Sequence, residues 1–253
     1  MIVLAQDAGL LAEACALFPA SGTQIYGYFS RYGNQYPFCT TWLCQEEDGT
    51  VWGAMGRYNQ SLRLSCGYPL LREQLGEVME FLRIAGCGTL EGPLPVLENL
   101  HMDSEIQSGS VMEYRGAVPE TAAKQIDVSP RLDDVFQILR GSDPAFDAQV
   151  RFDEWLCDAS HCLRHGGGWY AAVGKAAAAG VTALSPGYGL IGSVATLPGE
   201  RGRGCATLLV KWCVRRVLET GRIPVLMAAD ERAASLYRGI GFAETGRWGI
   251  INI

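Results

Sequence analysis

The chain has 253 residues, of which 48% are hydrophobic and 19% charged, and its formal net charge is −6. This composition can bury one large core or two modest ones, and no long stretch is rich enough in charge or proline to predict disorder. No basic segment precedes an apolar run at the start, and no apolar run approaches the ~20 residues that span a bilayer, which argues against a secreted or membrane protein. The nine cysteines are scattered and odd in number, so we expect reduced thiols and a cytoplasmic location.

The first half of the chain shows a faint alternation of helical and strand patterns. Helices are expected over residues 8–18, 24–32 and 71–84, and strands over 38–44, 51–57, 61–66, from 89 onward and over 111–115. Asp48-Gly49 marks a hairpin turn between the first two of these strands. Residues 118–129, with Pro119 and Pro130 near the ends, read as a linker.

The second half repeats the same order more clearly. Helices are expected over residues 131–139, 151–163, 203–220 and 231–238, and strands over 169–173, 178–184, 188–196, 223–228 and, as one strand or a pair, 242–251. This order predicts an α/β fold in which an antiparallel meander leads into a crossover. We therefore predict two related domains in tandem, residues 1–117 and 130–253, joined by the linker.

The two halves differ in charge. Residues 1–127 carry 7 basic and 15 acidic side chains, whereas residues 128–253 carry 14 basic and 12 acidic ones. Five basic residues gather between positions 201 and 216 with no acid among them: Arg201, Arg203, Lys211, Arg215 and Arg216. Such a local cationic region in an acidic chain suggests a small polyanionic ligand rather than DNA, although a solvated helix face would look the same.

A glycine-rich turn lies between the predicted strand 188–196 and the helix that follows it. Residues 194–206 read Val-Ala-Thr-Leu-Pro-Gly-Glu-Arg-Gly-Arg-Gly-Cys-Ala. A strand, a glycine-rich turn and a helix N-terminus together form an anion site, because the first helical N–H groups have no intrahelical partner. Arg201 and Arg203 would add charged donors. The dinucleotide fingerprint fails at Thr207, and the Gly-Lys-Ser/Thr ending of a Walker A loop is absent.

Residues 201–206 resemble the R/Q-x-x-G-x-G/A signature of the GCN5-related N-acetyltransferase superfamily. Residues 230–242, which include Leu236-Tyr237 and Gly241-Phe242, resemble that family's N-x-x-A-x-x-L-Y-x-x-x-G-F segment. The resemblance covers roughly residues 130–253. It implies a mixed sheet with splayed strands flanked by helices, and acetyl-CoA as cosubstrate. It also implies that residues 1–117 are a degenerate copy, because Cys66-Gly67-Tyr68-Pro69-Leu70 has neither the glycine pair nor the arginines.

The resemblance also assigns roles to residues. The pantetheine arm would bond to the backbone of residues 194–196, and the amides of residues 202–207 would hold the pyrophosphate. The resulting set of cofactor contacts is Val194, Ala195, Thr196, Arg201, Gly202, Arg203, Gly204, Cys205, Ala206 and Thr207. Tyr237 would protonate the leaving thiolate. Asp230 stands where the family usually has Asn, which leaves its contact with the coenzyme open.

Other candidate residues have weaker support. Cys205 lies beside a helix N-terminus, but only its backbone is needed, so a nucleophilic role is not expected. Cys157, His161 and His165 share one helix face, yet such a stripe is too long for all three to reach one ion, and no metal is expected. No general base is visible. Glu154, Asp230, Glu231 and a water chain all stay open.

The sequence therefore predicts an acetyl-CoA-dependent N-acetyltransferase that acts on an unidentified amine of a small molecule or peptide. A non-catalytic acyl-CoA sensor and a tandem aminoacyl transferase are the alternatives, and the net charge of −6 argues against the latter. We expect no nucleic acid or membrane partner. The tandem domains would form a monomeric pseudo-dimer, or the chain a homodimer.

Overall fold

The computed structural model describes residues 1–120 and 126–253, and the chain divides into two compact units. Unit 1 comprises Met1–Met112, Met227–Glu231 and Glu244–Ile253, and unit 2 comprises Glu113–Leu226 and Arg232–Ala243. Part of the predicted linker, residues 121–125, lies outside the described residues. The units do not follow chain order, because the last ten residues belong to unit 1. The predicted division at residues 118–129 stays a prediction.

Unit 1 contains a mixed sheet. Its strands are β1 (Ile2–Leu4), β2 (Cys39–Gln45), β3 (Val51–Tyr58), β4 (Ser61–Cys66), β5 (Thr89–Pro93), β6 (Gln107–Tyr114) and β11 (Phe242–Asn252). They lie in the order β1-β2-β3-β4-β5-β11-β6. The first four are antiparallel, β5 runs parallel to β4, and β11 is antiparallel to β5. The β4–β5 crossover carries a helix, as parallel connections require.

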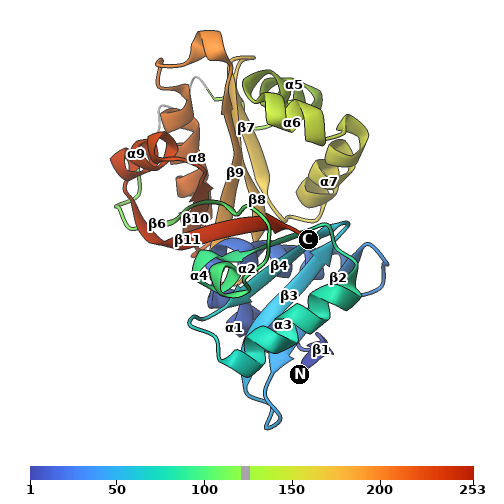
Figure 1. Cartoon of the computed structure of the whole chain (residues 1–253). Coiled ribbons are helices and arrows are strands. Elements are labelled where there is room, and N and C mark those ends of the chain that lie inside the picture. Colours follow the sequence, from blue (N-terminus) through green and yellow to red (C-terminus); the bar gives the residue numbers. More distant parts are fainter. Residues whose placement is uncertain (121–125) are drawn as a thin grey trace. The chain divides into compact units, whose positions relative to one another are not determined.

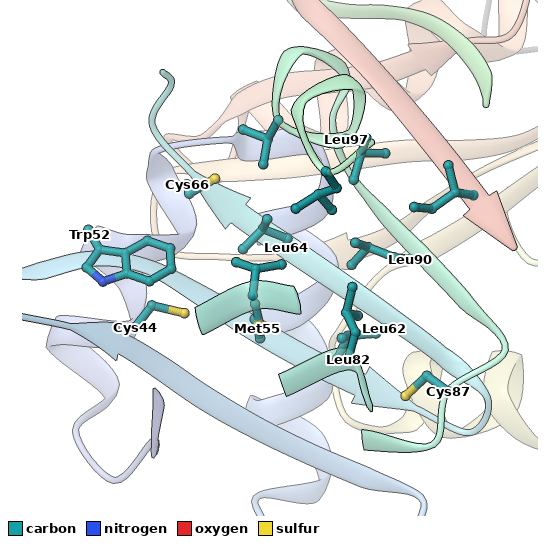
Figure 2. Close-up of a cluster of buried hydrophobic side chains, with 14 residues drawn as sticks. Cys44, Trp52, Met55, Leu62, Leu64, Cys66, Leu82, Cys87, Leu90 and Leu97 are labelled. Carbon is teal, nitrogen blue, oxygen red and sulfur yellow. The ribbon is translucent and has the colours of Figure 1, made fainter. Parts of the chain in front are cut away.

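Helices cover both faces of this sheet: α1 (Ala8–Ala16), α2 (Pro19–Tyr32), α3 (Arg72–Ala85) and α4 (Leu94–Asn99). Side chains alternate across a strand, so neighbouring residues of β3 enter different cores. Ala54 packs with Leu11 and Ile25 of α1 and α2. Met55 packs in a second cluster with Leu82 of α3 and with leucines of β4, β5 and α4 (Figure 2).

Unit 2 has an open sheet in the order β10-β9-β8-β7. The strands are β7 (Trp169–Val173), β8 (Ala177–Leu184), β9 (Tyr188–Thr196) and β10 (Ile223–Ala228), and the helices are α5 (Leu132–Ser142), α6 (Pro144–Gln149), α7 (Phe152–Arg164), the short 3-10 turn η2 (Pro198–Glu200), α8 (Cys205–Leu218) and α9 (Glu231–Ile240). β7, β8 and β9 are antiparallel, whereas β9 and β10 are parallel. Figure 1 shows α8 and α9 on one side of these strands and α5, α6 and α7 on the other.

The predicted α/β fold class is confirmed by this mixture of helices and mixed sheet. Most predicted elements form within a few residues of their expected bounds. Prediction missed β1, α4 and α6, which are too short to show a period, and the closing segment 242–251 forms one strand rather than two. Among the described residues, no helix is long and apolar enough to cross a membrane.

Candidate functional site

The turn between β9 and α8 has the backbone shape that its glycines allow. Gly202 has φ +80° and Gly204 has φ +79°, in the left-handed region that favours glycine. A Cβ placed on either residue would meet no atom within 4 Å, so the backbone faces open space there. Gly204 is also the N-cap of α8, and no side chain caps the helix.

Six consecutive backbone N–H groups of this turn find no acceptor within the described part of the chain. Leu208 is the first residue of α8 whose N–H finds a partner, the carbonyl of Gly204. Among the described residues, the N–H groups of residues 202–207 donate no hydrogen bond to any backbone or side-chain acceptor. Unpaired donors at a helix N-terminus, together with the helix dipole, favour an anion. The geometry therefore fits a phosphate-bearing ligand held by backbone groups.

The two arginines of the turn are already engaged. Arg201 donates from Nε to the carbonyl of Thr196 at 3.2 Å and from Nη2 to the carbonyl of Ser142 at 3.0 Å. Arg203 forms an ion pair with Glu200 at 2.6 Å. Arg201 thus ties the turn to the end of β9 and to the last residue of α5.

The rest of the predicted cationic region is also largely compensated. Arg215 and Arg216 both pair with Glu219 at 3.0 Å, and Arg216 lies 5.0 Å from the ring centroid of Trp169. These acids flank the basic run in sequence, so a count between positions 201 and 216 overlooks them. The charge of this region is therefore weaker than the sequence suggested, and the backbone donors carry more of the argument.

The end of β9 carries the other predicted contacts. Pairing with β10 runs from Tyr188–Ile223 to Ile191–Leu226 and includes no later residue of β9. On the β8 side the register shifts between Ala178–Ala195 and Gly180–Gly192, so β9 contains a bulge there. Ser193 within it has φ +51°. Nothing in the sequence signals this bulge, because serine is not among the residues that commonly adopt positive φ.

Residues 194–196 lie on the stretch of β9 that does not pair with β10, although Ala195 and Thr196 pair with β8 on the other side. Val194 and Thr196 are half-buried, and Ala195 is buried in a cluster with Val135 and Leu139 of α5. The hydroxyl Oγ1 of Thr196 is enclosed and has no hydrogen-bond partner among the described residues. A buried polar atom without a partner is costly unless a ligand or water completes it. This atom is a second sign that a ligand belongs at the end of β9.

Tyr237 lies on α9 and is 8% exposed. Its ring centroid is 6.0 Å from that of Phe242, in an edge-to-face arrangement, and Phe242 in turn contacts Tyr114 at 5.2 Å. The predicted motif residues Tyr237 and Phe242 thus pack together. This packing concerns the ring of Tyr237 and not its hydroxyl, so the catalytic role of Tyr237 stays a prediction.

The corresponding turn of unit 1, between β4 and α3, is built differently. α3 begins after Leu71, whose N–H donates to Oε1 of Gln74 at 2.8 Å, and Glu73 places a carboxylate in the first turn. A capping side chain and a negative charge at this position disfavour an anion. Unit 1 therefore lacks the features that suit the β9–α8 turn to a phosphate.

The cysteines and histidines form no metal centre. Among the described residues, no group of three His, Cys, Asp or Glu side chains is placed to hold an ion. The rings of His161 and His165 stack with centroids 4.1 Å apart. All nine cysteines are free, and only Cys157 and Cys205 are not buried.

Comparison with known proteins confirms the predicted superfamily resemblance. Residues 168–248, which include β9, the glycine turn, α8 and α9, match the family described as FR47-like protein. No curated protein sequence matches the chain. The fold is similar to that of solved GCN5-related N-acetyltransferases, one of which is described as a tandem protein.

These structures are similar over the full chain but distant in sequence. A tandem protein from the clavulanic acid biosynthesis pathway is 15% identical, covers 100% of this chain and 98% of its own, and gives a TM-score of 0.58. A GCN5-related N-acetyltransferase from Sphaerobacter thermophilus is 18% identical, with coverage of 100% and 95% and a TM-score of 0.61. A Drosophila protein is 11% identical, with coverage of 100% and 99% and a TM-score of 0.65.

Proposed function

We propose that unit 2 binds acetyl-CoA at the β9–α8 turn and transfers the acetyl group to an amine. The observation that carries this proposal is the run of six unpaired N–H groups over residues 202–207, at an uncapped helix N-terminus. The pyrophosphate accepts hydrogen bonds from these groups. The open space at Gly202 and Gly204 lets it approach the backbone closely.

The stretch of β9 that does not pair with β10 holds the pantetheine arm. Backbone groups of Val194, Ala195 and Thr196 bond to its amides as an added strand would, and the enclosed Thr196 hydroxyl gains a partner. Arg201 acts chiefly by holding the turn against Thr196 and Ser142, and the amides of residues 202–207, including Cys205, Ala206 and Thr207, contact phosphate. Arg203 contributes charge from the surface.

The reaction is direct transfer. The amine nitrogen attacks the thioester carbonyl, the C–S bond breaks, and the Tyr237 hydroxyl gives its proton to the leaving thiolate. The amine loses its proton to water or to a base that we do not assign. Positioning and a backbone donor to the carbonyl oxygen account for the rate, so no protein nucleophile takes part.

Isothermal titration of the full chain with acetyl-CoA tests binding, with NAD as a dinucleotide control. Saturable 1:1 binding of acetyl-CoA and none of NAD is expected. At 100 times the dissociation constant, acetyl-CoA should add about 2.7 kcal/mol to the free energy of unfolding. Absence of binding would overturn the proposal.

Thiol release over a panel of amines then tests catalysis. Amine-dependent release is expected with at least one acceptor. Binding without release from any amine would favour a non-catalytic acyl-CoA sensor, which the unassigned base keeps as the second candidate.

A further inference from the structure

A polar seam runs through unit 1 beneath α2. Ser21, Gln24, Tyr28 and Arg31 recur along one stripe of α2, where a core-facing helix would normally place aliphatic residues. Opposite them lie Tyr58 of β3, Arg63 of β4 and Glu91 of β5. Arg63 and Glu91 are paired in the parallel register of β4 and β5. We call these seven residues the α2 seam.

Glu91 is the only acidic side chain in the buried set of the described residues, at 9% exposure. Ser21 donates to its Oε1 at 2.9 Å and Gln24 at 3.2 Å, and the Arg63 Nε lies 3.8 Å from the same oxygen. Within the described chain, the second oxygen, Oε2, accepts no hydrogen bond. Oε2 is also not one of the enclosed atoms, so this oxygen is open to solvent or to a ligand.

Arg63 is incompletely paired as well. Its Nε and Nη1 atoms are enclosed and have no hydrogen-bond partner among the described residues, because 3.8 Å to Glu91 is too long for one. A buried ion pair repays its desolvation only when its remaining donors and acceptors are satisfied. Arg63 and Glu91 therefore do not satisfy each other's hydrogen-bonding groups. Arg63 can still donate to a further group, and Glu91 can still accept from one.

Tyrosine rings and a second arginine border the pair. The ring of Tyr28 stacks on that of Tyr58 with centroids 4.1 Å apart, and the Arg63 guanidinium lies 5.6 Å from the Tyr28 centroid. The Arg31 guanidinium lies 5.1 Å from the same ring, and its Nε is also enclosed without a partner. Two arginines thus border the ring of Tyr28, and Arg63 is the one that also lies against Glu91.

The chemistry that completes this seam is specific. The N–H donors of Arg63 that have no partner are best matched by an anionic oxygen, such as that of a carboxylate. The unused Oε2 of Glu91 requires a charged donor, for which an ammonium is suited. Arg63 and Glu91 are register partners, so one small zwitterion can contact both charges at once.

We propose that the α2 seam binds a small L-α-amino acid, with its carboxylate on Arg63 and its ammonium on Glu91. The tyrosine pair forms a wall for the ligand's carbon atoms. This site lies wholly in unit 1 and needs none of the residues of the β9–α8 turn, so it stands apart from acetyl-CoA binding.

Thermal shift of the full chain with each of the twenty standard L-amino acids tests the proposal. At least one should raise Tm by about 3 °C or more at saturation, as tight binding to the folded state requires. Two controls are made for each hit: the amine that lacks its carboxyl group and the acid that lacks its amino group. Both should bind at least about tenfold more weakly by calorimetry, because each loses one charge-assisted contact.

Two variants test the assigned contacts. Arg63→Met and Glu91→Gln should each raise the amino acid's Kd about tenfold or more. Arg72→Met removes an exposed guanidinium of α3 and should leave that Kd unchanged. If the single variants unfold, the double change Arg63→Met with Glu91→Leu replaces the pair by apolar groups, and should keep the fold and lose the binding.

Four outcomes would overturn the proposal. No shift with any amino acid would mean a structural ion pair only. Equal binding of the amine or the acid control would exclude a zwitterion, as would binding of inorganic phosphate in place of the amino acid. Unchanged affinity in both single variants would place the ligand elsewhere. Acetyl-CoA binding, measured in parallel, reports separately on unit 2.

Discussion

Arg201 donates a hydrogen bond from Nη2 to the carbonyl of Ser142 at 3.0 Å, and so joins two residues 59 positions apart in the chain. The same guanidinium donates from Nε to Thr196 at 3.2 Å. The β9–α8 turn is thus fixed at one side to the strand that precedes it and at the other to the end of α5. A residue that the motif presents as a phosphate ligand is used in this structure to hold the turn.

Arg201→Met should therefore loosen the turn rather than remove a phosphate contact. We expect acetyl-CoA affinity to fall about tenfold, because the amides of residues 202–207 lose their fixed arrangement. The slope of log Kd against log salt concentration should stay as in the wild type, since no ion pair with phosphate is lost. A flatter slope would show that Arg201 contacts phosphate directly. Lys175→Met, on an exposed turn, is the charge-matched control.

Gly204→Glu should abolish acetyl-CoA binding. The position has φ +79° and open space at its Cβ, so the new side chain is strained and places a carboxylate where the pyrophosphate is proposed to lie. Gly187→Glu makes the same charge change in the turn before β9, and should leave affinity unchanged. Calorimetry with acetyl-CoA distinguishes the two. Retained binding in Gly204→Glu would place the phosphate site elsewhere.

Tyr237→Phe should lower amine-dependent thiol release about 100-fold at saturating acetyl-CoA, since loss of a general acid typically costs that factor or more. The Kd for acetyl-CoA should change little. Tyr114→Phe is the matched control, because its ring also meets the edge of Phe242 while its hydroxyl donates to the carbonyl of Ala117 at 2.6 Å. Equal turnover in wild type and Tyr237→Phe would remove Tyr237 from the mechanism.

Thiol labelling offers a test that is independent of turnover. Burial raises the pKa of the Cys39 thiol to about 11 and that of the Cys15 thiol to about 12, so both stay protonated and shielded at pH 8. Only exposed Cys157 and half-buried Cys205 should react rapidly in the native chain. Acetyl-CoA should slow labelling at Cys205 alone, as peptide mapping would show. Unchanged labelling of Cys205 with bound acetyl-CoA would contradict the proposed position of the ligand.

Local patterns in the sequence were sufficient to predict most elements of both halves. The strand over residues 188–196, the strand over 223–228 and the apolar face of α8 form where periodicity places them, because each depends on the spacing of apolar residues within one segment. The glycine turn was predictable for the same reason. Positive φ at Gly202 and Gly204 is a property that glycine itself permits.

Other features were decided only by the tertiary structure, because they depend on contacts between residues far apart in the chain. The final strand, β11, pairs with β5 of unit 1, so Ile250 lies opposite Glu91 although 158 residues separate them in sequence. The engagement of Arg201 with Ser142, the bulge at Ser193 and the α2 seam arise in the same way. Amino-acid composition and the periodicity of apolar residues indicate which residues can be buried or charged. They do not indicate which of them meet, because register and crossover connections between distant segments settle that.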